Sequence, residues 1–297
     1  MGEIIGVSAA VLSSSIGGLS VGVTRFAVGA ADPITIGAFR FGIGSLLLLP
    51  LALRHRRCWP RLAEFGPIIG LGLLYFALFP ILFNASLIYT TAARGSLALS
   101  TLPVLTMLVG AMLRVEPLTR RKSIGVALAT LGVTVALLTN LSAAPEDAWR
   151  GDLLMVAAAF TMALYSIWSG PLAQRYGTIV YTALAMTFGG IALVSVAWAG
   201  GGLASTKAFG FHQWSAMAFL GIFGGAATFL LWSYALERTT PTRVAISVAV
   251  NPIISAVFGA YVLGEPVTAN LIAGLVLVAI GIAVATSNRR TASALGG

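Results

Sequence analysis

The chain has 297 residues, of which 58% are hydrophobic and only 9% are charged. A soluble domain carries about 25% charged residues, so a surface mostly exposed to water is excluded. The apolar residues come in long uncharged runs, and about 20 such residues in a helix span the ~30 Å hydrocarbon core of a bilayer. The net charge of +9 comes from basic residues between these runs, which favours membrane orientation signals over nucleic-acid binding.

Ten apolar segments follow one another along the chain. Backbone groups in a bilayer must form their hydrogen bonds within each segment, so we expect helices. The first segment lacks a basic leader and a cleavage site, which favours a membrane helix over a signal peptide. The sequence therefore predicts an all-α membrane protein with ten transmembrane helices, at roughly residues 4–24, 33–53, 65–88, 93–113, 120–140, 151–171, 178–199, 213–236, 242–263 and 268–287.

The positions of lysine and arginine predict the orientation. With the N-terminus in the cytoplasm, the inner loops hold 13 of the 18 basic residues and the outer loops hold four. Cytoplasmic loops of membrane proteins carry the excess of positive charge. We therefore expect a multi-pass protein of the bacterial cytoplasmic membrane with both termini in the cytoplasm, ending in a cytoplasmic tail of residues 289–297.

An internal repeat appears when the sequence is compared with itself at an offset of 149 residues. Residues 87–139 then share 15 identities in 53 positions with the second copy, without a gap. TTAAR at 90–94 lies over TTPTR at 239–243, and the Glu-Pro-x-Thr motif at 116–119 recurs at 265–268. Matches of this kind are not generic membrane residues, so we infer a duplication.

The repeat predicts two five-helix halves, residues 1–140 and 150–288. Because five is odd, the second half must enter the membrane from the opposite side. Inverted repeats are a recurring feature of secondary transporters, whose substrate site lies near the midplane where the repeats meet. This arrangement is the strongest functional signal in the sequence, and it predicts a central cavity between the halves.

The repeated motifs predict caps and breaks in the helices. Thr240 suits an N-cap and Pro241 the first helical position after it, while Glu-Pro-x-Thr suits a tight connector at the membrane edge. Pro103 and its counterpart Pro252 lie within spans, where proline kinks a helix. We interpret this pair as hinges along the transport path, and a structural kink with a hydrogen bond from Asn251 is the alternative.

The charges expected inside the membrane are few. All nine acidic residues lie in loops or at span ends, and among the basic residues only Arg40 falls well within a span. Intramembrane carboxylates are the usual proton relays and counter-ions for cations, so a proton-coupled extruder of organic cations is disfavoured. Carriers of sugar nucleotides or phosphorylated sugars need several convergent basic groups, so these are disfavoured as well.

The remaining candidates for a substrate site are uncharged. Aromatic, amide and hydroxyl side chains recur within the third, sixth, eighth and ninth segments, where they suit an apolar side chain and the polar ends of a zwitterion. Helix packing and interfacial belts are the competing explanations for such aromatic residues. The predicted substrate-binding residues are Tyr75, Phe79, Asn84, Tyr165, Trp168, Trp232 and Asn251.

Motifs for catalysis and for cofactors are missing from the sequence. There is no H-E-x-x-H, Walker A or G-x-G-x-x-G sequence, and the two histidines, His55 and His212, lie in predicted loops. The single cysteine, Cys58, excludes an intramolecular disulfide and a multi-cysteine metal site. We therefore expect neither an enzyme nor a bound cofactor or metal.

The repeated blocks TTAARGSLALSTLPV with VEPLT and TTPTRVAISVAVNPI with GEPVT resemble the drug/metabolite transporter superfamily, and within it the EamA family. The sequence looks most similar to YddG-type exporters of aromatic amino acids. The resemblance implies that helices 1–4 and 6–9 surround a central cavity, with helices 5 and 10 peripheral. It also implies export by alternating access, for which facilitated diffusion is one mode.

Our sequence-based hypothesis is therefore a monomeric exporter of neutral amino acids with aromatic or large apolar side chains and of related metabolites. Its partners would be the small-molecule substrate and the lipid bilayer, and no nucleic acid. One alternative is an exporter of lipophilic drugs or other uncharged metabolites. The other alternative, a membrane enzyme or scaffold without transport activity, would need a catalytic constellation or an appended domain.

Overall fold

The computed structural model describes residues 2–55, 59–90, 92–137, 147–255 and 269–286, which form helices joined by short connections and contain no strands within these ranges. Helices in this part of the chain are long and apolar enough to cross a membrane in six places. The chain is thus a multi-span helical membrane protein. The six segments are α1 Gly2–Ala27, α2 Pro33–Arg54, Leu62–Tyr89, α8 Ala148–Tyr176, α9 Thr178–Ala199 and Phe211–Arg238.

Two of these segments, Leu62–Tyr89 and Phe211–Arg238, correspond through the repeat, because the offset of 149 residues maps the ends of one onto the ends of the other. Each contains a π-helical turn inside an α-helix. Wider turns of this kind leave carbonyl groups without their usual helical partners and occur frequently at functional sites. The first segment comprises η2 Leu62–Glu64, α3 Phe65–Leu73, the π-helix η3 Leu74–Leu78 and α4 Phe79–Tyr89; the second comprises α10 Phe211–Phe219, the π-helix η6 Leu220–Ala227 and α11 Thr228–Arg238.

The segments that carry the two repeated prolines are interrupted. Two residues separate helix α5, Ala92–Leu99, from α6, Leu102–Met112, which has Pro103 in its first turn. In the second half, α12 Pro241–Ile246 tightens into the 3₁₀-helix η7 Ser247–Val250 before the helical residues 251–255. The backbone is therefore irregular immediately before each proline, and the part of this span at 256–263 lies outside the described residues.

The two remaining long helices form a pair at one edge of the bundle. Helix α7, Arg120–Leu137, packs mainly against α14, Ala269–Thr286. A short 3₁₀-helix, η5 Gly202–Ala208, connects α9 to α10. The predicted peripheral position of helices 5 and 10 thus agrees with the described part of the chain, and the predicted tail at 289–297 lies outside it.

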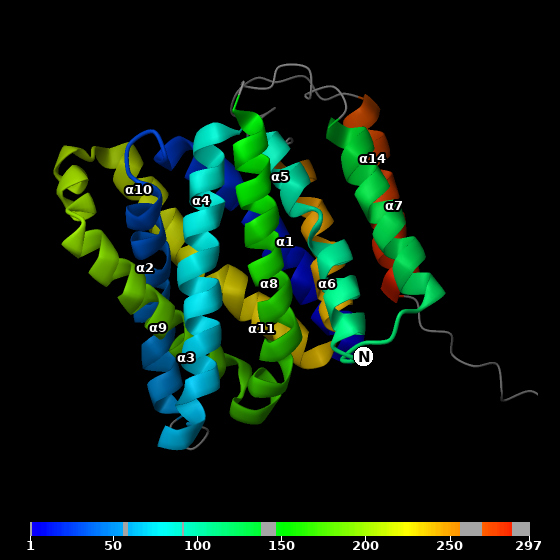
Figure 1. The fold of residues 1–297 in the computed structure, drawn as a ribbon, viewed down its shortest axis with the longest axis horizontal. Helices are drawn as coiled ribbons and strands as arrows, with labels where there is room; N and C mark the ends of the chain where they lie inside the picture. The colour runs from blue at the N-terminus through cyan, green and yellow to red at the C-terminus, as the bar shows by residue number, and fades with distance from the viewer. Residues whose placement is uncertain (1, 56–58, 91, 138–146, 256–268, 287–297) are drawn as a thin grey trace, which may run out of the picture.

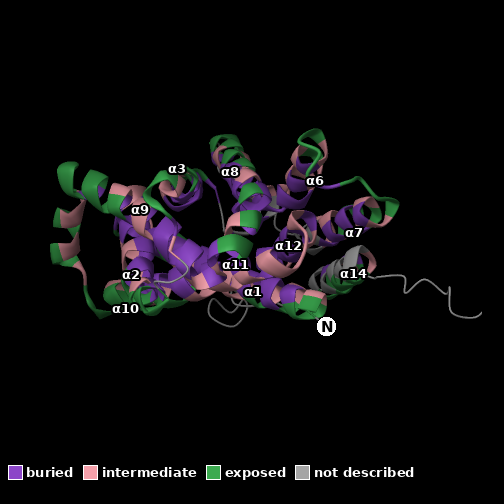
Figure 2. Cartoon of the chain, turned by 90° about the horizontal axis from the view of Figure 1, so that it is seen from below, coloured by how far each residue is buried: buried purple, intermediate pink, exposed green. Residues whose placement is uncertain are grey.

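Helices of the first half pack mostly against helices of the second half. Helix α1 lies against α11 and η7, while α8 lies against α4, α5 and α6; α2 pairs with α9. The contact of α1 with α11 corresponds through the repeat to that of α8 with α4, and the pairing of α2 with α9 maps onto itself. Figure 2 shows that the helices turn their buried faces toward one another and their exposed faces outward.

One buried cluster of polar side chains joins the halves near the start of α12. Glu116 accepts hydrogen bonds from the backbone N–H of Thr242 at 3.2 Å and from its hydroxyl at 3.0 Å, and it forms an ion pair with Lys122. Thr240 occupies the N-cap position and Pro241 the first turn, as predicted, but the Thr240 hydroxyl makes no capping bond. A carboxylate from the other half, favoured by the helix dipole, caps α12 instead.

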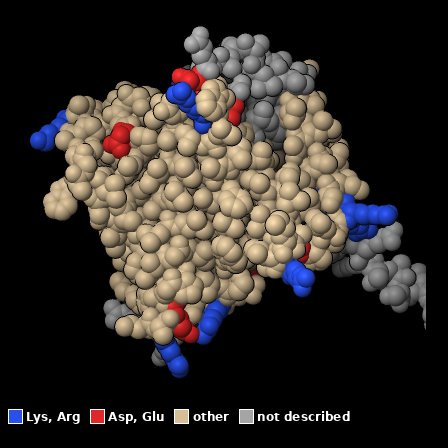
Figure 3. Space-filling model, in the orientation of Figure 1, with Lys and Arg blue, Asp and Glu red and all other residues tan. Residues whose placement is uncertain are grey.

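The outer surface is suited to lipid. Large apolar side chains are exposed along the outward faces, among them Leu46, Ile191 and Trp198. On the face shown in Figure 3, charged side chains gather near the ends of the helices and leave an uncharged band between them. Such a band matches the hydrocarbon region of a bilayer.

Candidate substrate-binding site

A cavity lies between the two halves at the centre of the bundle. Its volume is about 40 Å³, which is room for roughly three water molecules. A molecule as large as an aromatic amino acid would need more space than this. The wall consists of Ser13, Ser14, Gly17, Val21, Arg40, Tyr75, Phe79, Phe83, Leu99, Met162, Thr228, Phe229, Trp232, Val248 and Asn251.

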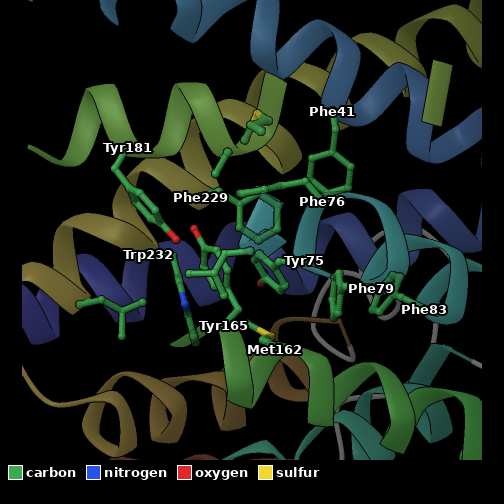
Figure 4. Packing of buried hydrophobic residues seen from close by; sticks show 14 of the residues in the cluster. Phe41, Tyr75, Phe76, Phe79, Phe83, Met162, Tyr165, Tyr181, Phe229 and Trp232 are labelled. Carbon is green, nitrogen blue, oxygen red and sulfur yellow. The ribbon is translucent and has the colours of Figure 1, made fainter. Parts of the chain in front are cut away.

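Aromatic rings form much of this wall, and Figure 4 shows them grouped around Tyr75 and Tyr165. The two tyrosine rings stack with centroids 4.1 Å apart and planes 19° apart. Phe229 meets Tyr75 edge-on at 5.2 Å, and Phe79 lies on its other side at 4.9 Å. Offset and edge-on contacts of this kind each add about 0.5–1.5 kcal/mol beyond burial, so they stabilise the packing of the aromatic rings.

Arg40 brings the only positive charge on the cavity wall among the described residues. Its side chain extends from α2, is 4% exposed, and donates from Nε and Nη2 to the backbone oxygen of Gly224 at 3.0 and 2.9 Å. The guanidinium carbon also lies 5.5 Å from the ring centre of Phe41 and 5.6 Å from that of Phe229. Gly224 belongs to the π-helix η6, so the arginine binds a carbonyl that the wider turn presents to it.

Three other polar groups on the wall have no hydrogen-bond partner within the described ranges. These are the hydroxyl of Tyr75, the indole N–H of Trp232 and the amide oxygen of Asn251. Each side chain is at least nine-tenths buried. A buried polar group without a partner costs about 1–3 kcal/mol, so three together on one wall indicate a surface shaped for a polar ligand or water.

Helix α1 closes the cavity on one side through a row of serines. Ser13 donates to the backbone oxygen of Thr228 at 2.8 Å, and the hydroxyls of Ser14 and Ser247 lie 2.7 Å apart. Ser255 donates to the oxygen of Gly18 at 2.8 Å. Hydroxyl pairs of this kind hold membrane helices together where apolar contact gives no preference over lipid.

Four of the seven predicted site residues lie on the cavity wall, namely Tyr75, Phe79, Trp232 and Asn251. Tyr165 lies behind the wall and supports Tyr75 by stacking. Asn84 is buried elsewhere and donates to the backbone oxygen of Pro33 at 2.8 Å, which fastens α4 to the start of α2.

Trp168 is not brought to the cavity: it is 43% exposed on the outer face of α8. The expectation that it faces the cavity is therefore corrected. Trp168 follows Tyr165 by three positions on the helix, so its side chain points about 60° away from that of Tyr165 and toward the lipid side.

Four residues of the cavity wall were not among the predicted site residues, namely Arg40, Ser13, Thr228 and Phe229. A signal for Arg40 was present, because an ionisable residue within a membrane span is by default a candidate functional residue. As a single basic group, Arg40 served only to disfavour phosphorylated substrates, which need several. The serine and threonine gave no comparable signal, since hydroxyls are common in membrane helices.

The sequence matches the model of the EamA-like transporter family twice, over residues 4–138 and 149–287. The chain belongs to this family. Two family relatives illustrate the similarity: an uncharacterized transporter of Archaeoglobus fulgidus is 26% identical over 278 residues, covering 92% of this chain and 95% of that protein. The uncharacterized transporter YcxC of Bacillus subtilis is 26% identical over 282 residues, covering 92% and 90%. These names specify no cargo.

The fold is shared with a protein of known crystal structure. The two structures superpose with a TM-score of 0.77 at 21% sequence identity, and the match covers 96% of each chain. At 21% sequence identity, the match shows that the two proteins share the arrangement of their helices. Together with the double family match, it supports a two-repeat membrane transporter.

Proposed function

We propose that this EamA family member exports neutral amino acids with aromatic or large apolar side chains, and related metabolites, across the bacterial cytoplasmic membrane. The observation that carries the proposal is the central cavity, whose wall combines packed aromatic rings with unpaired polar groups. An aromatic surface suits an apolar side chain, and a few fixed polar groups suit the polar end of an amino acid. The substrate-binding residues in this proposal are Tyr75, Phe79, Trp232 and Asn251.

The transport mechanism we propose is alternating access by two inverted five-helix repeats, ten helices in all, in a monomer. Helices from both repeats contribute to the cavity wall, so movement of one repeat against the other opens the cavity to one side at a time. Pro103 and Pro252, beside interrupted helices, serve as hinges. The chain carries no catalytic activity in this proposal.

The orientation we propose has both termini in the cytoplasm. Helix α1 begins and α14 ends at the same end of the bundle, the lower one in Figure 1. The same end of the bundle also holds the connections α6–α7, α8–α9 and α11–α12, which carry basic residues, and loops rich in lysine and arginine stay on the cytoplasmic side of a membrane. The substrate would thus enter the cavity from the side where the termini lie.

Flux measurements on purified protein in liposomes test the proposal. We expect uptake of at least one labelled neutral amino acid from a panel that includes tryptophan, phenylalanine, leucine and methionine, above the rate of protein-free liposomes. Repeating the measurement with and without a pH gradient distinguishes proton coupling from facilitated diffusion. Absence of flux for every neutral amino acid would refute the proposed function.

The alternative cargo, a lipophilic drug, is tested in the same liposomes. The three unpaired polar groups favour an amino acid, because a drug without hydrogen-bonding groups would leave them unsatisfied. We expect tryptophan or phenylalanine to compete with any labelled drug that the protein carries. Drug flux that no amino acid inhibits would favour the alternative.

A further inference from the structure

A buried arginine without an acidic partner is the most unusual group in the cavity. Within the described ranges, no carboxylate forms an ion pair with Arg40. A charge in the interior of a membrane protein is costly and is normally retained where it pairs or binds a substrate. We propose that Arg40 binds a carboxylate of the substrate, and that the substrates are amphipathic monocarboxylates whose ammonium group is dispensable. This inference rests on the proposed transport function.

The hydrogen-bonding capacity of Arg40 is only partly used. A guanidinium has five N–H groups, and here Nε and Nη2 donate to one acceptor, the backbone oxygen of Gly224. Both N–H groups of Nη1 and the second N–H of Nη2 are left without a bond among the described residues. The planar guanidinium can present two parallel N–H groups to a carboxylate, which is the strong bidentate form of this interaction.

The position of the guanidinium is fixed by its surroundings. The two bonds to Gly224 hold one edge of it, and the rings of Phe41 and Phe229 lie against it. An added methyl group at Gly224 would come within 3.4 Å of Nε and 2.8 Å of the Ser20 hydroxyl, so glycine allows this close approach. A preorganised donor loses little freedom when it binds a ligand, which favours affinity.

The other unpaired groups on the wall complete a site for an anion with an apolar tail. The Trp232 indole donates only, and the Tyr75 hydroxyl both donates and accepts. The Asn251 amide oxygen is an acceptor for a hydroxyl or ammonium on the substrate. No described carboxylate lies on the wall, so an ammonium would gain only a neutral partner, whereas a carboxylate would gain a charged one.

A purely structural role for Arg40 is the competing explanation, in which it only joins α2 to η6. In that case two N–H groups bind one carbonyl, while the other three form no hydrogen bond among the described residues. A neutral donor would satisfy the same carbonyl without placing a charge in the membrane. The two explanations differ in one measurable respect, because only the first predicts that Arg40 controls the preference for a carboxylate.

Three probes that differ at the polar end test this preference in wild-type protein. L-phenylalanine, L-3-phenyllactate and L-phenylalaninamide compete against labelled phenylalanine in liposomes, and their direct binding to purified protein is measured by calorimetry. We expect the two carboxylates to bind with similar affinity and the amide at least about tenfold more weakly. The inference would be overturned if L-phenylalaninamide bound as well as phenylalanine. It would also be overturned if L-3-phenyllactate bound no better than L-phenylalaninamide.

Variants of Arg40 are compared with a matched arginine outside the cavity. Arg25 donates from Nη1 to the backbone oxygen of Leu87 at 2.8 Å and is not part of the cavity wall. We expect Arg40→Gln to abolish the preference for acid over amide, Arg40→Lys to retain part of it, and Arg25→Gln to leave it unchanged. If folded Arg40→Gln keeps the wild-type preference, the arginine is structural.

The outcomes separate this inference from the proposed function. Flux of phenylalanine and its amide at equal rates would refute the role of Arg40 and leave amino acid export standing. Absence of flux for all amino acids would refute the export function, while binding of L-3-phenyllactate that depends on Arg40 would still support the carboxylate site. If Arg40 variants do not fold, the ranking of the three probes in wild type decides the question.

Discussion

Replacing Glu116 by glutamine tests the buried polar link between the two halves. Glu116 and Lys122 are 5% and 9% exposed, and the carboxylate of Glu116 also accepts two hydrogen bonds from Thr242. Glutamine keeps the shape but removes the charge, so the Lys122 ammonium is left buried without its partner. Removing one member of a buried ion pair costs about 3–5 kcal/mol, and weaker bonds to Thr242 act in the same direction.

Thermal unfolding of the purified protein in detergent measures this loss. A loss of 1 kcal/mol lowers Tm by roughly 2–4 °C in chains of 150–250 residues, so Glu116→Gln should lower Tm by at least about 5 °C. Asp147→Asn is the matched control, because the Asp147–Arg150 pair is more than half exposed on both side chains. Exposed pairs contribute about 0–1 kcal/mol, so this control should have little effect.

A second substitution decides whether the unpaired ammonium causes the loss. We expect Lys122→Met combined with Glu116→Gln to be more stable than Glu116→Gln alone, because no buried charge then remains unpaired. A Tm for Glu116→Gln within 1–2 °C of wild type would refute the reasoning. So would a double variant that is less stable by the full sum of the two single losses.

Three further predictions follow from close packing and from the cavity wall. Gly225→Ala should lower Tm, because a methyl group there would lie 2.4 Å from a backbone oxygen of α2. Gly70→Ala should not lower Tm, because nothing lies within 4 Å of a methyl group at that position. Equal melting curves for the two variants would contradict this. Tyr75→Phe removes an unpaired buried hydroxyl, so it should leave Tm unchanged or raised yet weaken substrate binding in calorimetry, and unchanged affinity would exclude this hydroxyl from the site. Trp232→Ala should reduce liposome flux more than about tenfold, whereas the exposed Trp168→Ala should retain it at equal reconstitution; the reverse order would refute our placement of the site.

The sequence predicted the helical class and the repeat because both leave marks that do not depend on packing. Runs of apolar residues follow from bilayer thickness, and the offset that aligns TTAAR with TTPTR also relates Leu62–Tyr89 to Phe211–Arg238. The π-helical turns in those two segments left no such mark. A change in local hydrogen bonding within a continuous apolar helix alters neither composition nor period.

The site was predicted less completely, for a physical reason. In a membrane protein both the lipid-facing and the buried sides of a helix are apolar, so an aromatic residue alone does not indicate which way it points. Tyr165 and Trp168 are three residues apart on α8, yet one is fully buried and the other is 43% exposed. Of the two predicted amides, Asn251 lies on the cavity wall, whereas Asn84 donates to the backbone oxygen of Pro33 away from it.

The packing of first-half helices against second-half helices also sets the order of events during synthesis. The hydroxyl of Ser14 pairs with that of Ser247, which lies 233 residues later in the chain. At about 5–20 residues per second, roughly 10–50 s pass before the ribosome delivers this partner. During that time α1 resides in the bilayer with its serines facing lipid or the insertion machinery. The contacts that join α1 to η7 can therefore form only after residue 247 has been translated, well after α1 itself has been made.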